Sequence, residues 1–255
     1  MLTALTRAVS RKLQSCELTH LSRQPIDIDK AVVQHWAYEK CLAQLGVNVV
    51  RLPALPDLAD ATFVEDPAVV FDEVAVLGRL GVESRHDEVP SVAQALAEYR
   101  EVRELREPAT LEGGDVMVAG KRVYVGLSSR TNAAAIDQLR GQLQPFGYTV
   151  DAVEVHGCLH LKTACSYVGD DTILVNREWI DAAPLDQFRV IDVAAAEPWA
   201  ANVLRIGKQL LMAEGFPATE CALRKAGFDI TTVDISELMK AEAGLTCMSL
   251  IFETN

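Results

Sequence analysis

The segment that decides the fold is "LEGGDVMVAGKRVYVGLSSRTN", residues 111–132. Two short apolar runs lie on either side of Ala119-Gly120-Lys121, and this pattern predicts two strands joined by a tight turn. The polar residue Glu112 comes just before the first strand, and a helical pattern follows the second strand over residues 128–147. The segment therefore predicts one strand–strand–helix unit with an acidic side chain at its entrance.

Similar units recur along the chain. Strand pairs that open on a polar residue return at intervals of 42 to 48 residues, beginning at Glu65, Glu112, His160, Asn202 and Cys247. A period near 45 residues is typical of repeated supersecondary units. If the units are arranged radially, as in a propeller, the polar starts of the first strands converge near the axis. That arrangement brings Glu, His and Cys together although dozens of residues separate them in sequence.

The rest of the chain alternates in the same way, and no linker divides residues 1–255 into separate domains. We expect one α/β domain. Helical spacing covers residues 27–46, 91–106, 128–147 and 217–228. Short apolar runs predict strands at 49–53, 68–71, 74–78, 115–120, 122–126, 165–169, 172–176, 203–207 and 209–213.

Composition limits the classes of partner. The chain has 49% hydrophobic and 24% charged residues, and its net charge is −12. An acidic surface without a basic patch repels phosphate backbones, so we expect no nucleic-acid partner, whereas a small cation is attracted. No apolar run approaches the roughly 20 residues of a membrane span. The six cysteines form no CxxC pair and the N-terminus lacks a signal-peptide pattern, so we expect a cytoplasmic protein.

Two residues suggest nucleophilic catalysis. In "GLTCMSLIF" (residues 244–252), Cys247 stands at the entrance of an apolar run that predicts a buried strand, and Gly244 would allow close approach of a ligand to the backbone. His160 lies in "HLKTACSYVG". A cysteine paired with a histidine is a candidate nucleophile with its general base.

A metal site is the competing interpretation of His160. In His156-x-Cys158-x-His160, three metal-capable side chains alternate along one predicted strand. A zinc or copper ion would still need a fourth ligand from elsewhere in the chain. We therefore expect no resident metal.

Several carboxylates border strands or glycine turns in segments too apolar to be solvated faces. Such groups need cationic partners, supplied by arginines such as Arg85 and Arg130 or by a cationic ligand. Together with the net charge they fit a site for a guanidinium. They are Asp60, Glu65, Asp66, Glu112 and Asp115.

At these residues the chain resembles the dimethylarginine dimethylaminohydrolase family, a branch of the guanidino-group-modifying pentein superfamily, and is most similar to its bacterial members. The resemblance runs from about Leu5 to Phe252. It is carried by the ordered set "FVEDPAVV", "LEGGDVMVAGKRVYVGLSSRTN", "HLKTACSYVG", "AAN" and "GLTCMSLIF". The resemblance implies a single-domain α/β propeller of five repeats, in agreement with the 45-residue period.

The resemblance also implies roles for individual residues. Cys247 would be the nucleophile, His160 the general acid and base, and Glu112 the carboxylate that supports His160 and binds the guanidinium. Three further groups would contact substrate. They are Asp60, Glu65 and Asp66 at the guanidinium end, Arg85 and Arg130 at the α-carboxylate, and the Leu18 carbonyl at the α-amino group.

One departure concerns the segment before the nucleophile, where Ala241 and Glu242 are expected to line the pocket. The family commonly has Asp in a "DG" pair, but this chain has Glu242 followed by Ala243. Glu is one methylene longer, so its carboxylate would either intrude on the pocket or turn away. The size of N-alkyl group that the site accepts is therefore left open.

The implied activity is hydrolysis of asymmetric dimethylarginine and monomethylarginine to citrulline and methylamines, without a cofactor. Zinc would act only as an inhibitor, by capturing Cys247 and His160. The partner would be a small cationic guanidino compound, and a homodimer is compatible with the sequence. The alternatives are an arginine deiminase-like hydrolase of another guanidino substrate and a non-catalytic binding module on the same propeller.

Overall fold

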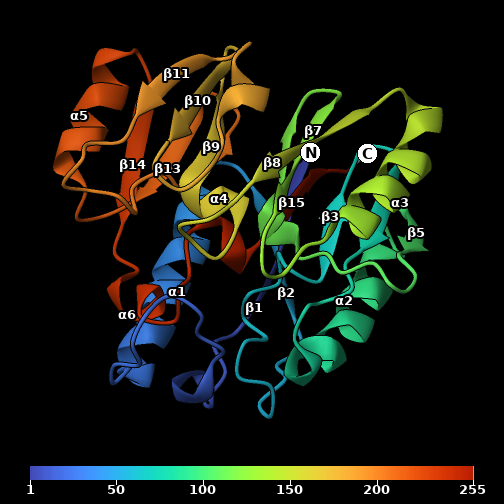
Figure 1. Ribbon diagram of the computed structural model, residues 1–255. Helices are drawn as coiled ribbons and strands as arrows, with labels where there is room; N and C mark the ends of the chain where they lie inside the picture. The colour runs from blue at the N-terminus through green and yellow to red at the C-terminus, as the bar shows by residue number, and fades with distance from the viewer. Residues whose placement is uncertain (255) are drawn as a thin grey trace.

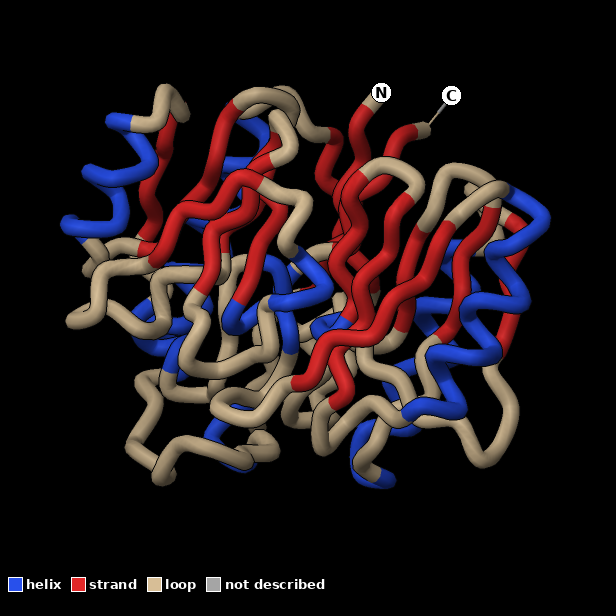
Figure 2. Tube along the Cα trace, turned by 45° about the horizontal axis from the view of Figure 1, so that its top comes forward, coloured by secondary structure: helices blue, strands red, loops and turns tan. Residues whose placement is uncertain are grey.

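The computed structural model describes residues 1–254 and contains five three-stranded sheets arranged around a central axis (Figure 1). We call each sheet with its helix a blade. Each blade has an antiparallel first pair of strands, and its third strand joins the second strand in parallel. The helix that connects the second and third strands lies on the outer rim (Figure 2). The α/β propeller of five repeats is therefore confirmed.

The blades follow the chain in order, with one exception at the ends. The helices of the first three blades are α1 (Ile28–Gln44), α2 (Val89–Leu96) and α3 (Ala133–Leu143), in that order. The first blade contains β15 (Leu250–Glu253), β1 (Leu2–Arg7) and β2 (Asn48–Leu52). The second contains β3 (Ala68–Val70), β4 (Val74–Leu77) and β5 (Glu101–Glu104). The third contains β6 (Val116–Ala119), β7 (Arg122–Leu127) and β8 (Thr149–Glu154).

The fourth blade has only the 3-10 turn η5 (Ala183–Leu185) where the others have a helix, and the fifth has α5 (Pro217–Lys225). Short helices α4 (Leu161–Ala164) and α6 (Ser236–Met239) and turns η3 (Gly113–Asp115) and η6 (Thr246–Met248) lie between blades. Turns η1 (Leu13–Ser15), η2 (Glu83–Glu88) and η4 (Gln144–Phe146) lie within blades, in the connections between second and third strands. The remaining strands are β9 (Cys165–Gly169), β10 (Thr172–Val175) and β11 (Arg189–Asp192), then β12 (Val203–Ile206), β13 (Gln209–Ala213) and β14 (Asp229–Val233).

The last strand of the chain closes the ring. β15 pairs antiparallel with β1, from Leu2 opposite Glu253 to Leu5 opposite Leu250, so the two termini lie side by side (Figure 1). This pairing makes the C-terminal strand the first strand of the blade that begins the chain. The segment around Cys247 therefore reaches the axis in the same way as the segments that open the other blades.

One predicted helix is wrong over its second half. The helical spacing of residues 91–106 holds only to Leu96, and β5 begins at Glu101. β5 pairs in parallel with β4 along its whole length, and Val102 packs against the adjacent core cluster. The ladder of backbone hydrogen bonds and the burial of Val102 override the helical preference of this charged stretch.

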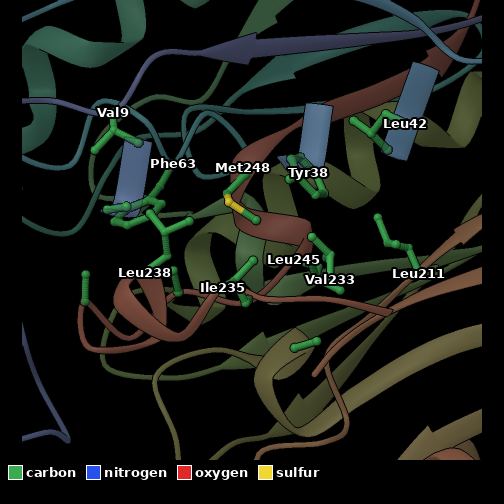
Figure 3. Close-up of a cluster of buried hydrophobic side chains, with 14 of the residues drawn as sticks. Val9, Tyr38, Leu42, Phe63, Leu211, Val233, Ile235, Leu238, Leu245 and Met248 are labelled. Atoms are coloured by element: carbon green, nitrogen blue, oxygen red, sulfur yellow. The ribbon is translucent and has the colours of Figure 1, made fainter. Parts of the chain in front are cut away.

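The hydrophobic core is divided among the blades, and one cluster packs against the segment that carries Cys247 (Figure 3). In that cluster Tyr38 and Leu42 of α1 pack with Leu245 and Met248 on either side of Cys247. The Tyr38 hydroxyl also lies 2.6 Å from the Ser249 hydroxyl. This packing fixes the segment that carries the thiol against α1.

Among residues 1–254, none of the helices combines the length and the apolar character that crossing a bilayer requires.

Candidate active site

The polar residues that open the blades converge at one end of the axis. The pocket there is narrow, with a cavity of about 20 Å³, which is room for about one water molecule, and we call this narrow arrangement the closed pocket. Eight of the residues predicted to form the site line it, together with Glu17, Phe63, Leu159 and Ala243. The eight are Asp60, Asp66, Arg85, Arg130, His160, Ala241, Glu242 and Cys247.

Cys247 lies in η6, three residues before β15, and its side chain is partly exposed. The Gly244 backbone N–H donates to Cys247 Sγ at 3.3 Å. Gly244 is needed because a Cβ there would lie 2.3 Å from the Asn202 amide carbon. The close approach expected at Gly244 is therefore made by the Asn202 side chain.

The thiol is held in its neutral form while the pocket is closed. Burial raises the pKa of Cys247, and the carboxylates of Glu65 and Asp66 raise this pKa further. The Gly244 N–H and the Lys162 ammonium act in the opposite direction but do not outweigh these effects. A cation placed beside Cys247 would favour the thiolate.

His160 and Glu112 form a buried pair. His160 Nε2 lies 2.7 Å from Glu112 Oε2, and neither side chain is exposed by more than a few per cent. The geometry depends on Gly114, because a Cβ there would lie 2.5 Å from His160 Nδ1. Asp115 fixes the same segment from below by accepting the Leu161 backbone N–H at 2.9 Å.

The charges of this pair follow from its neighbours. Burial by itself would lower the pKa of His160, but Asp66, Asp115 and Glu112 together raise the pKa to about 9. Burial would likewise raise the pKa of Glu112, yet the hydrogen bond with His160 and the nearby arginines hold this pKa below its usual range. At neutral pH the pair is therefore an imidazolium against a carboxylate.

The two arginines of the pocket contact its carboxylates directly. Arg85 Nη1 lies 2.9 Å from Asp66 Oδ2, and Arg130 Nη1 lies 3.3 Å from Glu112 Oε1. Arg85 is also held by Glu88, which accepts from its Nε at 3.0 Å and from its Nη2 at 2.9 Å. The groups expected to bind opposite ends of a substrate thus neutralise one another in the closed pocket.

Glu65 supports the segment that carries Cys247. It does not line the pocket, and its oxygens contact Lys162 Nζ at 2.5 Å and the Thr246 hydroxyl at 2.7 Å. The Glu65 backbone N–H also donates to the Cys247 carbonyl at 3.2 Å. Asp60 does line the pocket, and its carboxylate accepts the Glu17 backbone N–H at 3.1 Å.

Glu242 faces residues 17–21, which we call the entrance loop. Its carboxylate accepts the backbone N–H groups of Thr19, His20 and Leu21, at 3.0, 2.5 and 2.5 Å. Its backbone has φ of +57°, a conformation that is uncommon for residues other than glycine. Leu18, in the same loop, packs its side chain against the core cluster that also contacts Cys247.

The strand predicted to carry His156, Cys158 and His160 is wrong, because these residues lie in the loop between β8 and α4, and their side chains do not converge on a metal site. His156 Nε2 lies 3.1 Å from the Glu178 carbonyl, and Cys158 Sγ donates to the His160 carbonyl at 3.2 Å. Within residues 1–254 the one group of metal-capable atoms that lie within 4.8 Å of each other is Asp66, Glu112 and His160. Those three belong to the pocket already described.

Sequence reasoning missed three supporting residues. Glu88 lies three residues beyond Arg85, which is the spacing of an ion pair on one helical turn, so a signal for it was present. Lys162 and Thr246 act across distant segments, and the sequence carried no signal of their pairing with Glu65. Asn202 was expected near the axis because it opens a strand pair, and its side chain donates to the Thr246 hydroxyl at 3.1 Å.

Comparison with known proteins agrees with this arrangement. The chain matches the family model described as N,N dimethylarginine dimethylhydrolase, eukaryotic, over residues 14–250. It is 38% identical over 248 residues to the N(G),N(G)-dimethylarginine dimethylaminohydrolase of Streptomyces coelicolor, which covers 97% of this chain and 95% of the relative.

Two solved structures are similar over nearly the whole chain. One is DDAH from Pseudomonas aeruginosa, a cysteine-to-serine mutant complexed with citrulline, with a TM-score of 0.93, 30% identity and 98% of each chain covered. The other is a dimethylarginine dimethylaminohydrolase adduct with S-methyl-L-thiocitrulline, with a TM-score of 0.92, 30% identity, and 98% of this chain and 99% of that chain covered. The pentein fold expected from the resemblance is confirmed.

Proposed function

Because this chain belongs to the dimethylarginine dimethylaminohydrolase family, we propose that it hydrolyses Nω-methylated L-arginines to L-citrulline and methylamines. The reaction proceeds through a covalent thiouronium on Cys247. The substrates are asymmetric dimethylarginine and monomethylarginine. The observation that carries this proposal is the His160–Glu112 pair, which lines or backs the same pocket as Cys247.

Substrate binding exchanges ion pairs. A methylated arginine carries a guanidinium at one end and an α-carboxylate at the other, so each end replaces one member of an existing pair. The guanidinium takes Asp66 from Arg85 and Glu112 from Arg130, while the freed arginines bind the α-carboxylate. The closed cavity is too small for this substrate, so binding also requires the entrance loop to move.

The remaining predicted contacts complete the pocket. Asp60 lies beside Glu17 at the entrance loop, where the α-amino group and the Leu18 carbonyl would meet. Ala241 and Glu242 form the opposite wall. Glu65 acts through Thr246 and Lys162, which hold the nucleophile segment in place.

The bound cation turns the thiol into a nucleophile. The pKa of Cys247 is raised in the closed pocket, and a guanidinium beside the sulfur offsets the two carboxylates that raise it. The thiol releases its proton to solvent as the cation binds, and the thiolate then attacks the central carbon of the guanidinium. The tetrahedral adduct expels methylamine or dimethylamine, and His160 donates the proton that this leaving group needs.

Hydrolysis completes the cycle. His160, now neutral, accepts a proton from a water that attacks the thiouronium carbon, and Glu112 stabilises the imidazolium that forms. Collapse of the second adduct breaks the carbon–sulfur bond and releases citrulline. Every step uses side chains of this chain, and we propose that no cofactor takes part.

The setting of the reaction is also part of the proposal. We propose that residues 1–255 form one catalytic unit, because the site draws on strands from the first and last parts of the chain. Six cysteines in the described residues are free thiols, which supports a reducing compartment such as the cytoplasm.

The test is a colorimetric citrulline assay with arginine, monomethylarginine and asymmetric dimethylarginine. We expect citrulline from both methylated substrates at a higher kcat/KM than from arginine. Citrulline and norleucine should not inhibit well, because neither supplies a cation to Asp66 and Glu112. If arginine is the best substrate, the deiminase interpretation replaces this one, and if none reacts, the binding-module interpretation does.

A further inference from the structure

A second pocket adjoins the active site along the segment that carries Glu242. Its cavity has a volume of about 100 Å³, whereas the closed pocket of the active site has about 20 Å³. Glu242 and Ala243 line both cavities. Gly244 lines the second cavity, and its backbone N–H donates to Cys247 Sγ at 3.3 Å. The second cavity, which we call the side pocket, therefore borders the segment that holds the nucleophile.

The walls of the side pocket are aromatic and apolar. Trp199, Phe216 and Met239 line it and are only partly buried. Ile235 and Leu245, which belong to the core cluster in Figure 3, also line it and are almost completely buried. The side pocket is therefore closed at the core and opens to solvent beside the aromatic residues.

Trp199 is a fixed part of this wall. Its ring packs edge-on with the ring of Trp179, and the two ring centroids lie 4.6 Å apart. Gly157 permits this packing, because a Cβ at that position would collide with the Trp179 ring. A tryptophan held in this way attracts alkylated ammonium ions through its π system, and aromatic pockets are used for such ions in other proteins.

The side pocket also has a carboxylate at its border. Leu21 lines the pocket, and its backbone N–H donates to Glu242 Oε1, which accepts from His20 as well. Glu242 Oε2 accepts one backbone N–H, that of Thr19. Because an ionised carboxylate offers about four acceptor positions, Oε2 can accept one more hydrogen bond. The pocket thus combines an aromatic wall with an anionic acceptor, which suits a small organic cation.

We propose that the side pocket binds the alkylammonium product and is the route by which this amine leaves, an inference that rests on the proposed function. After the amine is expelled, the rest of the substrate is still attached to Cys247. Its α-carboxylate is then bound by Arg85 and Arg130, so the substrate itself fills the way back to the entrance loop. The amine needs a different exit, and the side pocket shares Glu242 and Ala243 with the site where the amine is formed.

The amine fits the side pocket as a cation. His160 supplies the proton with which the amine leaves the tetrahedral adduct. The free amine then takes a second proton from solvent, because its basicity is close to that of a lysine side chain. Dimethylammonium presents two methyl groups to the aromatic wall and an N–H to Glu242 Oε2. A cavity of about 100 Å³ has room for its three non-hydrogen atoms.

An NMR titration with dimethylammonium chloride tests the site without turnover. The chain has three tryptophans, and the indole N–H signal of Trp199 is identified by its absence in Trp199→Phe. We expect this signal to shift saturably with a Kd on the order of millimolar, which is near the limit for a ligand of three non-hydrogen atoms. The signal of Trp36, an exposed ring on α1, should not move. Propan-2-ol, which has the same shape without the charge, should bind at least about tenfold more weakly.

Two variants test the two kinds of wall. Trp199→Ala and Glu242→Gln should each raise the Kd of dimethylammonium about tenfold, measured from the Gly244 backbone amide signal. Trp36→Ala and Glu73→Gln make the same changes on other parts of the surface and should leave this Kd unchanged. Melting temperatures verify that each variant is folded, and Glu242→Gln decides the question if Trp199→Ala is not.

Inhibition of turnover separates this inference from the proposed function. Dimethylammonium should inhibit citrulline formation noncompetitively with the methylated substrate, and Trp199→Ala should raise the inhibition constant about tenfold. Competitive inhibition would place the amine in the active-site pocket and overturn the inference. Citrulline formation without a saturable shift at Trp199 would also overturn it and leave the proposed function standing. A saturable shift in a chain that forms no citrulline would refute the exit role together with the proposed function, and only alkylammonium binding would remain.

Discussion

Replacing Glu112 by Gln tests how His160 keeps its proton. Glu112 Oε2 lies 2.7 Å from His160 Nε2, and Gln keeps an oxygen at that place while removing the charge. A charge-assisted hydrogen bond contributes roughly 1.5–3 kcal/mol and a neutral one roughly 0.5–1.5 kcal/mol. The midpoints of these ranges differ by about 1.25 kcal/mol, or about one pKa unit.

The direction of the change follows from the partners of His160. Its pKa is raised to about 9 by three carboxylates, and the variant removes one of them while Asp66 and Asp115 remain. We therefore expect a pKa of about 8 in Glu112→Gln. At pH above this value the general acid lacks its proton, so the alkaline limb of the kcat profile should move down by the same amount.

The assay is an NMR titration of the histidine ring protons, which reports the proton on His160 without relying on turnover. The chain has five histidines, and the His160 signal is identified by its absence in His160→Asn. Glu73→Gln, at a partly exposed surface ion pair with Lys121, is the matched control and should leave the His160 pKa unchanged.

The same pair should appear in the pH dependence of stability. A histidine whose pKa is raised on folding stabilises the protein fully below about 6.5, and this stabilisation is lost as pH rises through about 9. The melting temperature should therefore fall between about pH 6.5 and pH 9, and by less in Glu112→Gln. A His160 pKa in Glu112→Gln that equals or exceeds that of the unaltered chain would refute the electrostatic account.

Three further outcomes are expected. Glu88→Gln weakens the ion pair that holds Arg85, so KM should rise on the order of tenfold with little change in kcat. Burial raises the pKa of Glu88 to about 7, so in the unaltered chain Glu88 is protonated below pH 7 and KM should rise there, whereas the KM of Glu88→Gln should not change with pH in this range. Glu242→Ala removes three hydrogen bonds to the entrance loop, so hydrogen exchange of residues 19–21 should accelerate while Glu242→Gln has a smaller effect. Micromolar zinc should inhibit by binding Cys247 and His160, and EDTA should not, whereas loss of activity in EDTA would indicate a resident metal.

The sequence predicted the ring because each blade opens on a polar residue and its first two strands are apolar. Glu112 stands before β6 with only η3 between them, and His160 stands before β9 with only α4 between them, so each polar side chain is conspicuous beside an apolar strand. The period of these markers follows from the geometry of the repeat, so counting residues was enough to predict that they converge.

The third strands could not be predicted in the same way, with the exception of β2, which matches the strand predicted at residues 49–53. β5 has the sequence Glu-Val-Arg-Glu, and it forms a strand because β4 supplies hydrogen-bond partners along one edge. β8 and β14 likewise carry exposed polar residues on the outer side of their sheets. The pairing of strands distant in sequence decides their conformation, and no local pattern records it.

The inner contacts of the site were also beyond the sequence. The sequence predicted Glu65 among the carboxylates that bind the substrate guanidinium, but its partners are Lys162 and Thr246, which are distant in the chain. Glu242 was recognised as unusual from its length, but the fold alone shows that its carboxylate reaches the backbone of residues 19–21. The type of chemistry was therefore predictable, and the supports that hold it in place were not.

The most direct test of the central claim is to trap the covalent intermediate. The protein is mixed with excess monomethylarginine or asymmetric dimethylarginine, quenched in acid within one turnover, and measured by mass spectrometry. Because the methylated nitrogen leaves before hydrolysis, both substrates should add the same mass, located on the peptide that contains Cys247. Cys221→Ser, which alters an exposed thiol, should behave like the unaltered chain, and Cys247→Ser should show no adduct. Turnover without any adduct at Cys247, or with adducts that differ between the two substrates, would contradict the proposed mechanism.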